Sequence, residues 1–138
     1  MSLPVSLRRL QALAAEFLRF GLVGTVGYLV DTATVYALKG MIGPGPAGMP
    51  SFLVAATVTW ALNRSWTWRG RGSGGSRLRQ WAHFIAVSSP GLFLNRSIYE
   101  FLVFAMPLCA TYPFLATGAG TLAGMFVNFG LSRRLIFR

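Results

Sequence analysis

The sequence predicts an all-α membrane protein with four transmembrane helices, built as two helical hairpins. Hydrophobic residues make up 54% of the chain and charged residues only 12%, about half the charge typical of a soluble domain. The apolar residues come in long blocks without an alternation of period two, which favours spanning helices over a barrel. At 138 residues the chain is expected to form a single domain.

The N-terminal stretch, residues 5–18, has the pattern of an amphipathic helix. Its apolar side chains fall on one helical stripe, namely Leu7, Leu10, Leu13, Ala14, Phe17 and Leu18. We expect a short helix in the membrane interface, continuous with the first span or hinged to it, with Glu16 in solvent. The alternative is a disordered tail. The apolar block that follows is too long for a signal peptide and lacks a convincing cleavage site.

The first predicted span, Arg19–Leu38, contains one carboxylate, Asp31. Eight strongly apolar residues in it gain about 0.3–0.6 kcal/mol each on insertion, whereas a central Asp costs about 2.5–3.5 kcal/mol. Asp31 therefore cancels most of what its helix gains. Because ionisable residues inside a membrane usually face a cavity or pathway, Asp31 is predicted to be functional. The alternative is a structural hydrogen bond or ion pair.

The second span is predicted at about Ser51–Leu62, after a turn rich in Gly and Pro over residues 40–50. It continues into the interface, where Trp66 and Trp68 are expected to act as interfacial anchors.

The second half of the chain contains the other two spans, at about Trp81–Ala105 and Phe114–Leu131, with an uncharged turn over residues 106–113. Pro90 and Gly91 predict a kink in the third span. Gly120 and Gly124 form a GxxxG pattern in the fourth span, which indicates close helix packing.

The basic residues indicate the orientation in the membrane. The net charge is +10, from 13 Lys and Arg against three acids. Eleven of the basic residues lie in the N-terminal segment, the central loop and the C-terminus: Arg8, Arg9, Arg19, Arg64, Arg69, Arg71, Arg77, Arg79, Arg133, Arg134 and Arg138. Both termini and the central loop are therefore predicted to be cytoplasmic. Because these residues sit at the ends of apolar blocks, the charge does not indicate nucleic-acid binding.

The two halves of the chain are an internal repeat. An offset of 64 aligns Phe20 with Phe84, Gly27 with Gly91 and Asp31 with Asn95, and an offset of 69 aligns residues 63–69 with residues 132–138. The repeats cover about residues 17–69 and 81–138, joined by a basic cytoplasmic loop over residues 70–80. Each half is an in–out–in hairpin, so the two have parallel topology.

Three motifs carry a resemblance to a known family: RFGLVGTVGYLVD near the start, ALNRSWTWR after the second span, and VNFGLSRRLIFR at the C-terminus. In this order and spacing, the chain resembles the GtrA-like family of membrane proteins of cell-surface polysaccharide synthesis, over about residues 17–138. Two departures are Thr59-Trp60, where the family usually has Asn-Phe, and Ser132, where an Asn is common. They favour a division of tasks between the halves.

The resemblance implies movement of a polyprenyl-phosphate-linked monosaccharide across the bacterial cytoplasmic membrane, for use by a glycosyltransferase on the outer side. We expect a polar midplane cluster to hydrogen-bond the sugar, consisting of Asp31, Asn95, Arg96 and Glu100. We expect a second set to bind the phosphate at the headgroups, consisting of Arg64, Arg133, Arg134, Asn63 and Asn128. The alternatives are that Glu100 neutralises Arg96, that Asn95 holds packing, and that the arginines are positive-inside anchors.

No cofactor, metal or enzymatic activity is expected. The single Cys109 excludes an internal disulfide and a Cys-based metal site, and no nucleotide-binding or soluble catalytic motif is present. The expected partners are the lipid-linked sugar, membrane lipids, a membrane glycosyltransferase and a second copy of the chain, with a dimer favoured. Two other functions stay open: a scaffold or regulator of a glycosyltransferase, and a small multidrug-type transporter. Against the latter, Arg96 could pair with Asp31.

Overall fold

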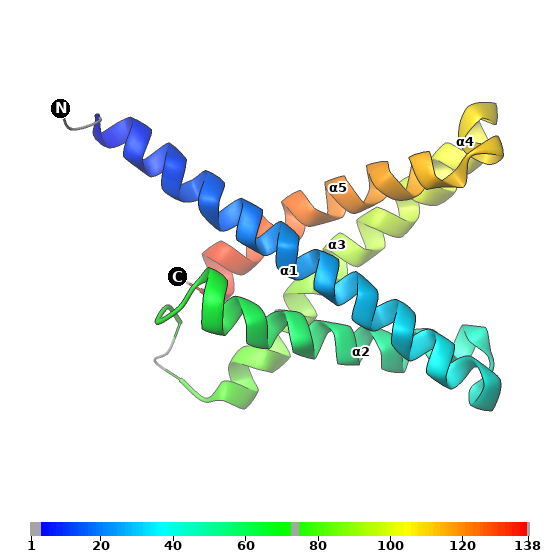
Figure 1. Ribbon diagram of the computed structural model, residues 1–138, viewed down its shortest axis with the longest axis horizontal. Helices are drawn as coiled ribbons and strands as arrows, with labels where there is room; N and C mark the ends of the chain where they lie inside the picture. The colour runs from blue at the N-terminus through cyan, green and yellow to red at the C-terminus, as the bar shows by residue number, and fades with distance from the viewer. Residues whose placement is uncertain (1–3, 73–74, 138) are drawn as a thin grey trace. The chain divides into compact units, whose positions relative to one another are not determined.

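The computed structural model describes residues 4–72 and 75–137, and every regular element within these two ranges is a helix (Figure 1). The all-α prediction is therefore confirmed. The chain divides into two compact units, Met1–Ser73 and Gly74–Arg138. Arg138, one of the basic residues used to predict orientation, lies outside the described residues, as do residues 73 and 74 of the predicted basic loop.

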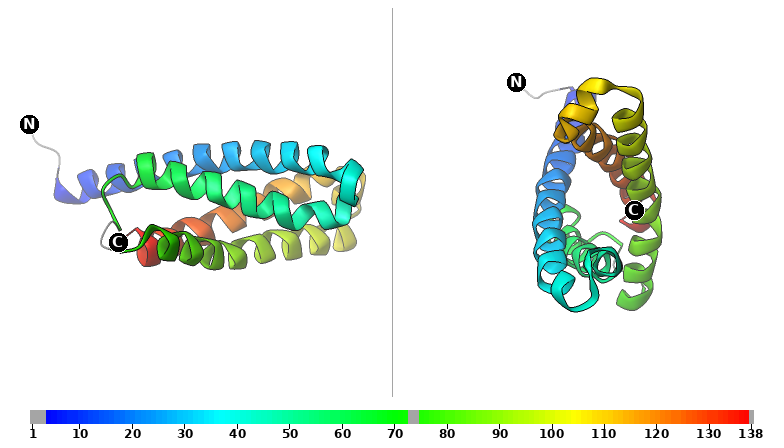
Figure 2. Two further views of the ribbon diagram at one scale, coloured as in Figure 1. Left: turned by 90° about the horizontal axis from the view of Figure 1, so that it is seen from below. Right: turned by 90° about the vertical axis from the view of Figure 1, so that its right-hand side faces the viewer.

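Unit 1 is a helical hairpin. Helix α1 runs without interruption over Val5–Ile42, 38 residues, or about 57 Å. Helix α2, Pro44–Leu62, returns along α1 and continues into a π-helical turn, η1, Asn63–Thr67 (Figures 1 and 2). The N-terminal stretch is thus continuous with the first predicted span, and the alternatives of a hinge and a disordered tail are wrong.

The turn in unit 1 is much shorter than predicted. Instead of a break over residues 40–50, Gly43 alone separates α1 from α2, with a φ of 85° that favours glycine. Helix α2 starts at Pro44, not near Ser51. The prediction failed because proline is favoured at the first position of a helix. A backbone N–H there would have no intrahelical partner, and the fixed φ of proline matches that of a helix. Pro50 lies within α2.

Unit 2 is also a helical hairpin, formed by α3, Arg77–Ala105, and α5, Pro113–Leu131, which pack along each other (Figure 1). The predicted uncharged turn between them contains a short helix, α4, Pro107–Thr111. Helix α3 includes Pro90, and α5 continues into a second π-helical turn, η2, Ser132–Ile136.

The GxxxG pattern gives close packing, as predicted. A Cβ added at Gly120 would lie 2.6 Å from the carbonyl oxygen of Asn95, and one at Gly124 would lie 2.8 Å from the carbonyl oxygen of Gly91. Helix α5 therefore approaches the backbone of α3 along its glycine face. In unit 1, Gly27 provides the same clearance for the side chain of Thr59.

The two units share an unusual local structure at positions that the repeat aligns. Each π-turn closes with a 2.9 Å hydrogen bond, from the Trp68 N–H to the Asn63 carbonyl in unit 1 and from the Phe137 N–H to the Ser132 carbonyl in unit 2. The aromatic ring that ends each turn packs on the first helix of its own unit. The ring centroids of Trp68 and Phe20 are 5.5 Å apart, and those of Phe137 and Phe84 are 6.3 Å apart.

By length and composition, one helical stretch among the described residues, Val5–Leu38 in α1, could cross a membrane. Only 17% of its most apolar window is buried, whereas the core helix of a soluble protein would be mostly covered. Large hydrophobic side chains are also exposed on α3, including Phe93 and Phe104.

Candidate functional site

Asp31 occupies the middle of the unit 1 hairpin. It lies midway between Phe20, which packs on Trp68, and Ile42 at the turn, about 16 Å along α1 from each. Its side chain is half-buried, and among the described residues it has no hydrogen-bond or ion-pair partner. If the hairpin crosses a hydrocarbon layer about 30 Å thick, this carboxylate lies near the midplane.

Asn95 occupies the corresponding position in unit 2, about midway along α3 between Phe84 and Ala105. Its carbonyl oxygen and its Oδ1 face Gly120, where an added Cβ would lie 2.6 and 2.7 Å from them. Asn95 thus lies in the close contact between α3 and α5. This placement fits a role in packing, one of the alternatives the sequence left open.

A polar cavity of about 300 Å³ opens beside this contact. It is lined by Asn95, Arg96, Tyr99 and Thr117, which together present an amide, a guanidinium, a phenol and a hydroxyl group. Thr117 belongs to it because it lies one helical turn before Gly120, on the α5 face that packs on α3. The volume of this cavity lies at the lower end of the range typical of small-ligand sites. We call these four residues the unit 2 pocket.

Within the pocket, Arg96 is held by its neighbours on α3. Its Nη2 lies 3.1 Å from Oε1 of Glu100, and its Cζ lies 5.7 Å from the centroid of the Tyr99 ring. The structure therefore forms the Arg96–Glu100 pair that the sequence left open as an alternative. The side chains of this pair are 74% and 59% exposed. A pair between Arg96 and Asp31, which belong to different units, stays a prediction.

The guanidinium and the phenol of the unit 2 pocket have no counterparts at the aligned positions of unit 1. The repeat aligns Arg96 with Thr32 and Tyr99 with Val35. A cavity of about 270 Å³ on unit 1 is mostly apolar and is lined by Leu53, Val54, Thr57 and Val58 of α2. The two hairpins therefore present different chemistry: unit 1 has a carboxylate without a partner among the described residues, and unit 2 has a polar pocket with a paired guanidinium.

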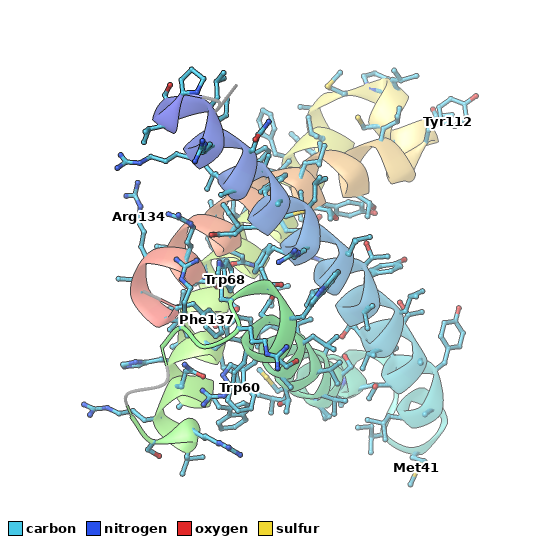
Figure 3. The ribbon with its side chains drawn as sticks, turned by 60° about the vertical axis from the view of Figure 1, so that its left-hand side comes forward. Met41, Trp60, Trp68, Tyr112, Arg134 and Phe137 are labelled. Carbon is cyan, nitrogen blue, oxygen red and sulfur yellow. The ribbon has the colours of Figure 1, made fainter. Side chains whose placement is uncertain are left out.

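The predicted headgroup arginines lie in the π-turns. Arg64 and Arg133 are the second residues of η1 and η2, and both are half-buried. The Arg64 Cζ lies 6.0 Å from the centroid of the Trp60 ring. Arg134 is exposed and extends away from η2 (Figure 3).

The two asparagines grouped with these arginines lie inside their hairpins. Asn63 is 1% exposed, and its Oδ1 accepts a 2.7 Å hydrogen bond from the Thr67 hydroxyl, which favours a structural role in η1. The Asn128 side chain packs against Gly91, and its Oδ1 is buried without a partner among the described residues. The buried Oγ of Ser132 is likewise unpaired there. A buried polar group left without a hydrogen bond lowers the free energy of unfolding by about 1–3 kcal/mol.

A further cluster in unit 1 was missed by the sequence analysis. Glu16 accepts a 2.9 Å hydrogen bond from the Trp68 indole N–H through Oε2, and its Oε1 pairs with Arg71 Nη1 at 2.9 Å. Glu16 is 17% exposed and Trp68 only 1%, so the expectation of a solvated Glu16 is wrong, and the Trp68 ring is buried within the hairpin. The repeat offered a signal, because it aligns Glu16 with Gln80, a buried polar residue.

Comparison with known proteins agrees with the sequence motifs. A family model described as "GtrA/DPMS, transmembrane domain" matches residues 19–137, which confirms the resemblance. The match includes Asp31, the unit 2 pocket and both π-turns, and leaves out the first part of α1. No curated protein matches the chain.

Proposed function

Because this chain belongs to the GtrA/DPMS transmembrane-domain family, we propose that it translocates a polyprenyl-phosphate-linked monosaccharide across the bacterial cytoplasmic membrane. The sugar then serves a glycosyltransferase on the outer side. The protein itself breaks and forms no covalent bond in this proposal and is not an enzyme.

The unit 2 pocket is the observation that carries this proposal. The lipid tail of such a substrate stays in hydrocarbon, whereas its sugar must cross it, and an unpaired hydroxyl costs several kcal/mol in an apolar medium. Asn95, Arg96, Tyr99 and Thr117 offer donors and acceptors at mid-length of a hairpin. Asp31 offers an acceptor at the aligned position of the other hairpin, midway along its span. The volume of the unit 2 pocket, about 300 Å³, is enough for a single sugar ring.

The proposal includes a membrane arrangement. Each hairpin contributes two spans, giving four, and the ends that carry η1 and η2 face the cytoplasm. Arg64, Arg133 and Arg134 then lie at the headgroup level, where a guanidinium can bind phosphate with several donors. Because four spans enclose little volume, we propose a homo-oligomer, with a dimer favoured, that works beside a membrane glycosyltransferase.

A transport assay with the purified protein tests this function. Liposomes that contain only this protein receive a labelled polyprenyl-phosphate sugar on one leaflet, and an impermeant enzyme or reagent reports its arrival on the other. We expect translocation well above that of protein-free liposomes. Equal rates with and without protein would refute transport by this chain.

One observation favours a second function, that of a scaffold for a glycosyltransferase. Residues 4–15 are all exposed, and this part of α1 extends beyond η1 (Figure 2). It also precedes the matched domain, so a partner could bind it without disturbing the hairpins. Under this alternative, removing residues 4–12 abolishes association with the glycosyltransferase. Under the transport proposal, the same deletion leaves translocation intact.

The third function, export of small cationic compounds, gains one argument. The sequence counted against it a pairing of Arg96 with Asp31, and an arginine that already pairs with Glu100 is less available to Asp31. The same liposomes, loaded with an organic cation under a proton gradient, distinguish it from sugar-lipid transport.

A further inference from the structure

We propose that the unit 2 pocket selects an uncharged sugar and discriminates against a uronic acid. This inference rests on the proposed function, which it deepens by naming the chemical class of the sugar. It follows from the charge balance of the pocket and from how its side chains are held.

The charge balance is neutral. Arg96 is the one cation of the pocket, and Glu100 lies 3.1 Å from it, one helical turn further along α3. The charges of Glu100 and Arg96 cancel each other, so the pocket offers no excess positive charge to a sugar carboxylate. A uronate placed here would compete with Glu100 for the guanidinium of Arg96, so it would gain less from binding than it would beside an unpaired arginine.

The polar groups also have partners within unit 2. The guanidinium of Arg96 lies beside Glu100 and over the face of the Tyr99 ring. Asn95 lies in the close contact of α3 with α5 at Gly120. Donors and acceptors that already have an orientation suit the hydroxyl groups of a neutral sugar, because less side-chain freedom is lost when it binds.

The other hairpin reinforces this preference. Asp31 occupies the aligned position of unit 1, and among the described residues it has no ion-pair partner. A sugar carboxylate that meets Asp31 during translocation is repelled by this like charge. A neutral sugar meets an additional hydrogen-bond acceptor.

Competition binding in lipid nanodiscs tests the inference. The protein is bound to a labelled polyprenyl-phosphate glucose, and three competitors are compared: polyprenyl-phosphate glucose, polyprenyl-phosphate glucuronic acid and sugar-free polyprenyl phosphate. We expect the glucose lipid to compete at least 10-fold better than the glucuronic acid lipid. Glu100→Gln frees Arg96 and should lower this ratio at least fivefold, mainly by tighter binding of the glucuronic acid lipid.

Two further variants keep the test decisive. Glu16→Gln makes the same chemical change outside the pocket and should leave the ratio unchanged. Arg96→Glu combined with Glu100→Arg reverses the pair but keeps it neutral, and should retain the preference for glucose even if Glu100→Gln folds poorly.

The possible failures are distinguishable. If the glucose and glucuronic acid lipids both compete better than sugar-free polyprenyl phosphate but equally well with each other, the inference is wrong and the proposed function stands. If neither competes better than the sugar-free lipid, the pocket binds no sugar, and the inference fails together with the proposed function.

Discussion

The indole N–H of Trp68 donates a 2.9 Å hydrogen bond to the carboxylate of Glu16, 52 residues earlier in the chain. This bond ties the π-turn at the end of α2 to α1. In unit 2, Phe137 and Gln80 take the aligned positions, and a phenylalanine ring has no N–H to donate. The two hairpins are therefore stabilised by different contacts at the aligned position.

The first prediction concerns this bond. Glu16→Ala should lower the free energy of unfolding by about 1–3 kcal/mol, because it leaves the buried indole donor unpaired. Glu16→Gln keeps an acceptor for Trp68 and loses only the pair with the partly exposed Arg71, so about 0.5–1 kcal/mol is expected. Thermal unfolding in detergent measures both. Arg8→Gln, in the exposed start of α1, is the control and should change stability little; equal stability of Glu16→Ala and this control would contradict the prediction.

The second prediction concerns the helix contact in unit 2. Gly120→Ala should destabilise the protein by about 1–3 kcal/mol, because its methyl group would meet the backbone of Asn95. Gly118→Ala is the matched control on the same helix, where an added Cβ meets nothing within 4 Å. It should be neutral or slightly stabilising, since alanine favours a helix over glycine by about 1 kcal/mol. Similar unfolding temperatures for the two variants would show that α5 does not pack here.

The third prediction is that Asp31 acts in transport and not only in folding. Asp31→Asn keeps the shape and one acceptor oxygen but removes the charge. We expect normal insertion and oligomeric state, and a loss of at least 10-fold in the liposome translocation rate. Thr32→Ala, at the next position of α1, is the control and should translocate normally. Wild-type rates for Asp31→Asn would show that the carboxylate is dispensable for transport.

The fourth prediction concerns the phosphate. Replacing Arg64, Arg133 or Arg134 with Gln should weaken binding of polyprenyl phosphate about 10-fold to 150-fold, the loss expected for about 1.5–3 kcal/mol of a hydrogen bond to a charged group. Binding is measured by competition in nanodiscs. Arg8→Gln, in the exposed start of α1, is the control. Unchanged affinity in all three variants would show that these arginines do not bind the phosphate and act only as positive-inside anchors.

The fifth prediction is the topology. Reporter fusions after Arg138 and within residues 70–76 should both behave as cytoplasmic, because the basic residues concentrate at the two termini and in the central loop. A fusion at the turn near Gly43 should report the opposite side. A periplasmic signal from either of the first two fusions would mean that the four-span arrangement is wrong.

Periodic and repeated features could be predicted from the sequence, because each depends on residues close in the chain. The helical class follows from the apolar blocks, and the contact of α3 with α5 follows from Gly120 and Gly124. The turn over residues 40–50 was predicted wrongly because Pro44 starts α2 at its first position, where proline is favoured, and Pro50 lies in its interior without ending it. Composition alone does not distinguish these two positions.

The site was predictable only in part. Asn95 and Arg96 were identified by the repeat, and Glu100 by its spacing from Arg96. Thr117 joins them only because the glycines of α5 determine how α5 packs along α3. The relative position of two packed helices cannot be predicted from the sequence of either helix alone. Glu16 was misjudged for a similar reason, since the partners that bury it come from the far end of the hairpin.

The paired π-turns also bear on how the chain arose. A π-turn accommodates one residue more than the α-helix around it, and here η1 and η2 carry that extra residue at aligned positions, each followed by a buried aromatic ring. The simplest history is a single ancestral hairpin that already contained the insertion and was then duplicated and fused. Independent insertions would have had to fall on the same position twice. The acid at Asp31 and the amide at Asn95 then record divergence after that duplication, when one ancestral gene had become two halves of one protein.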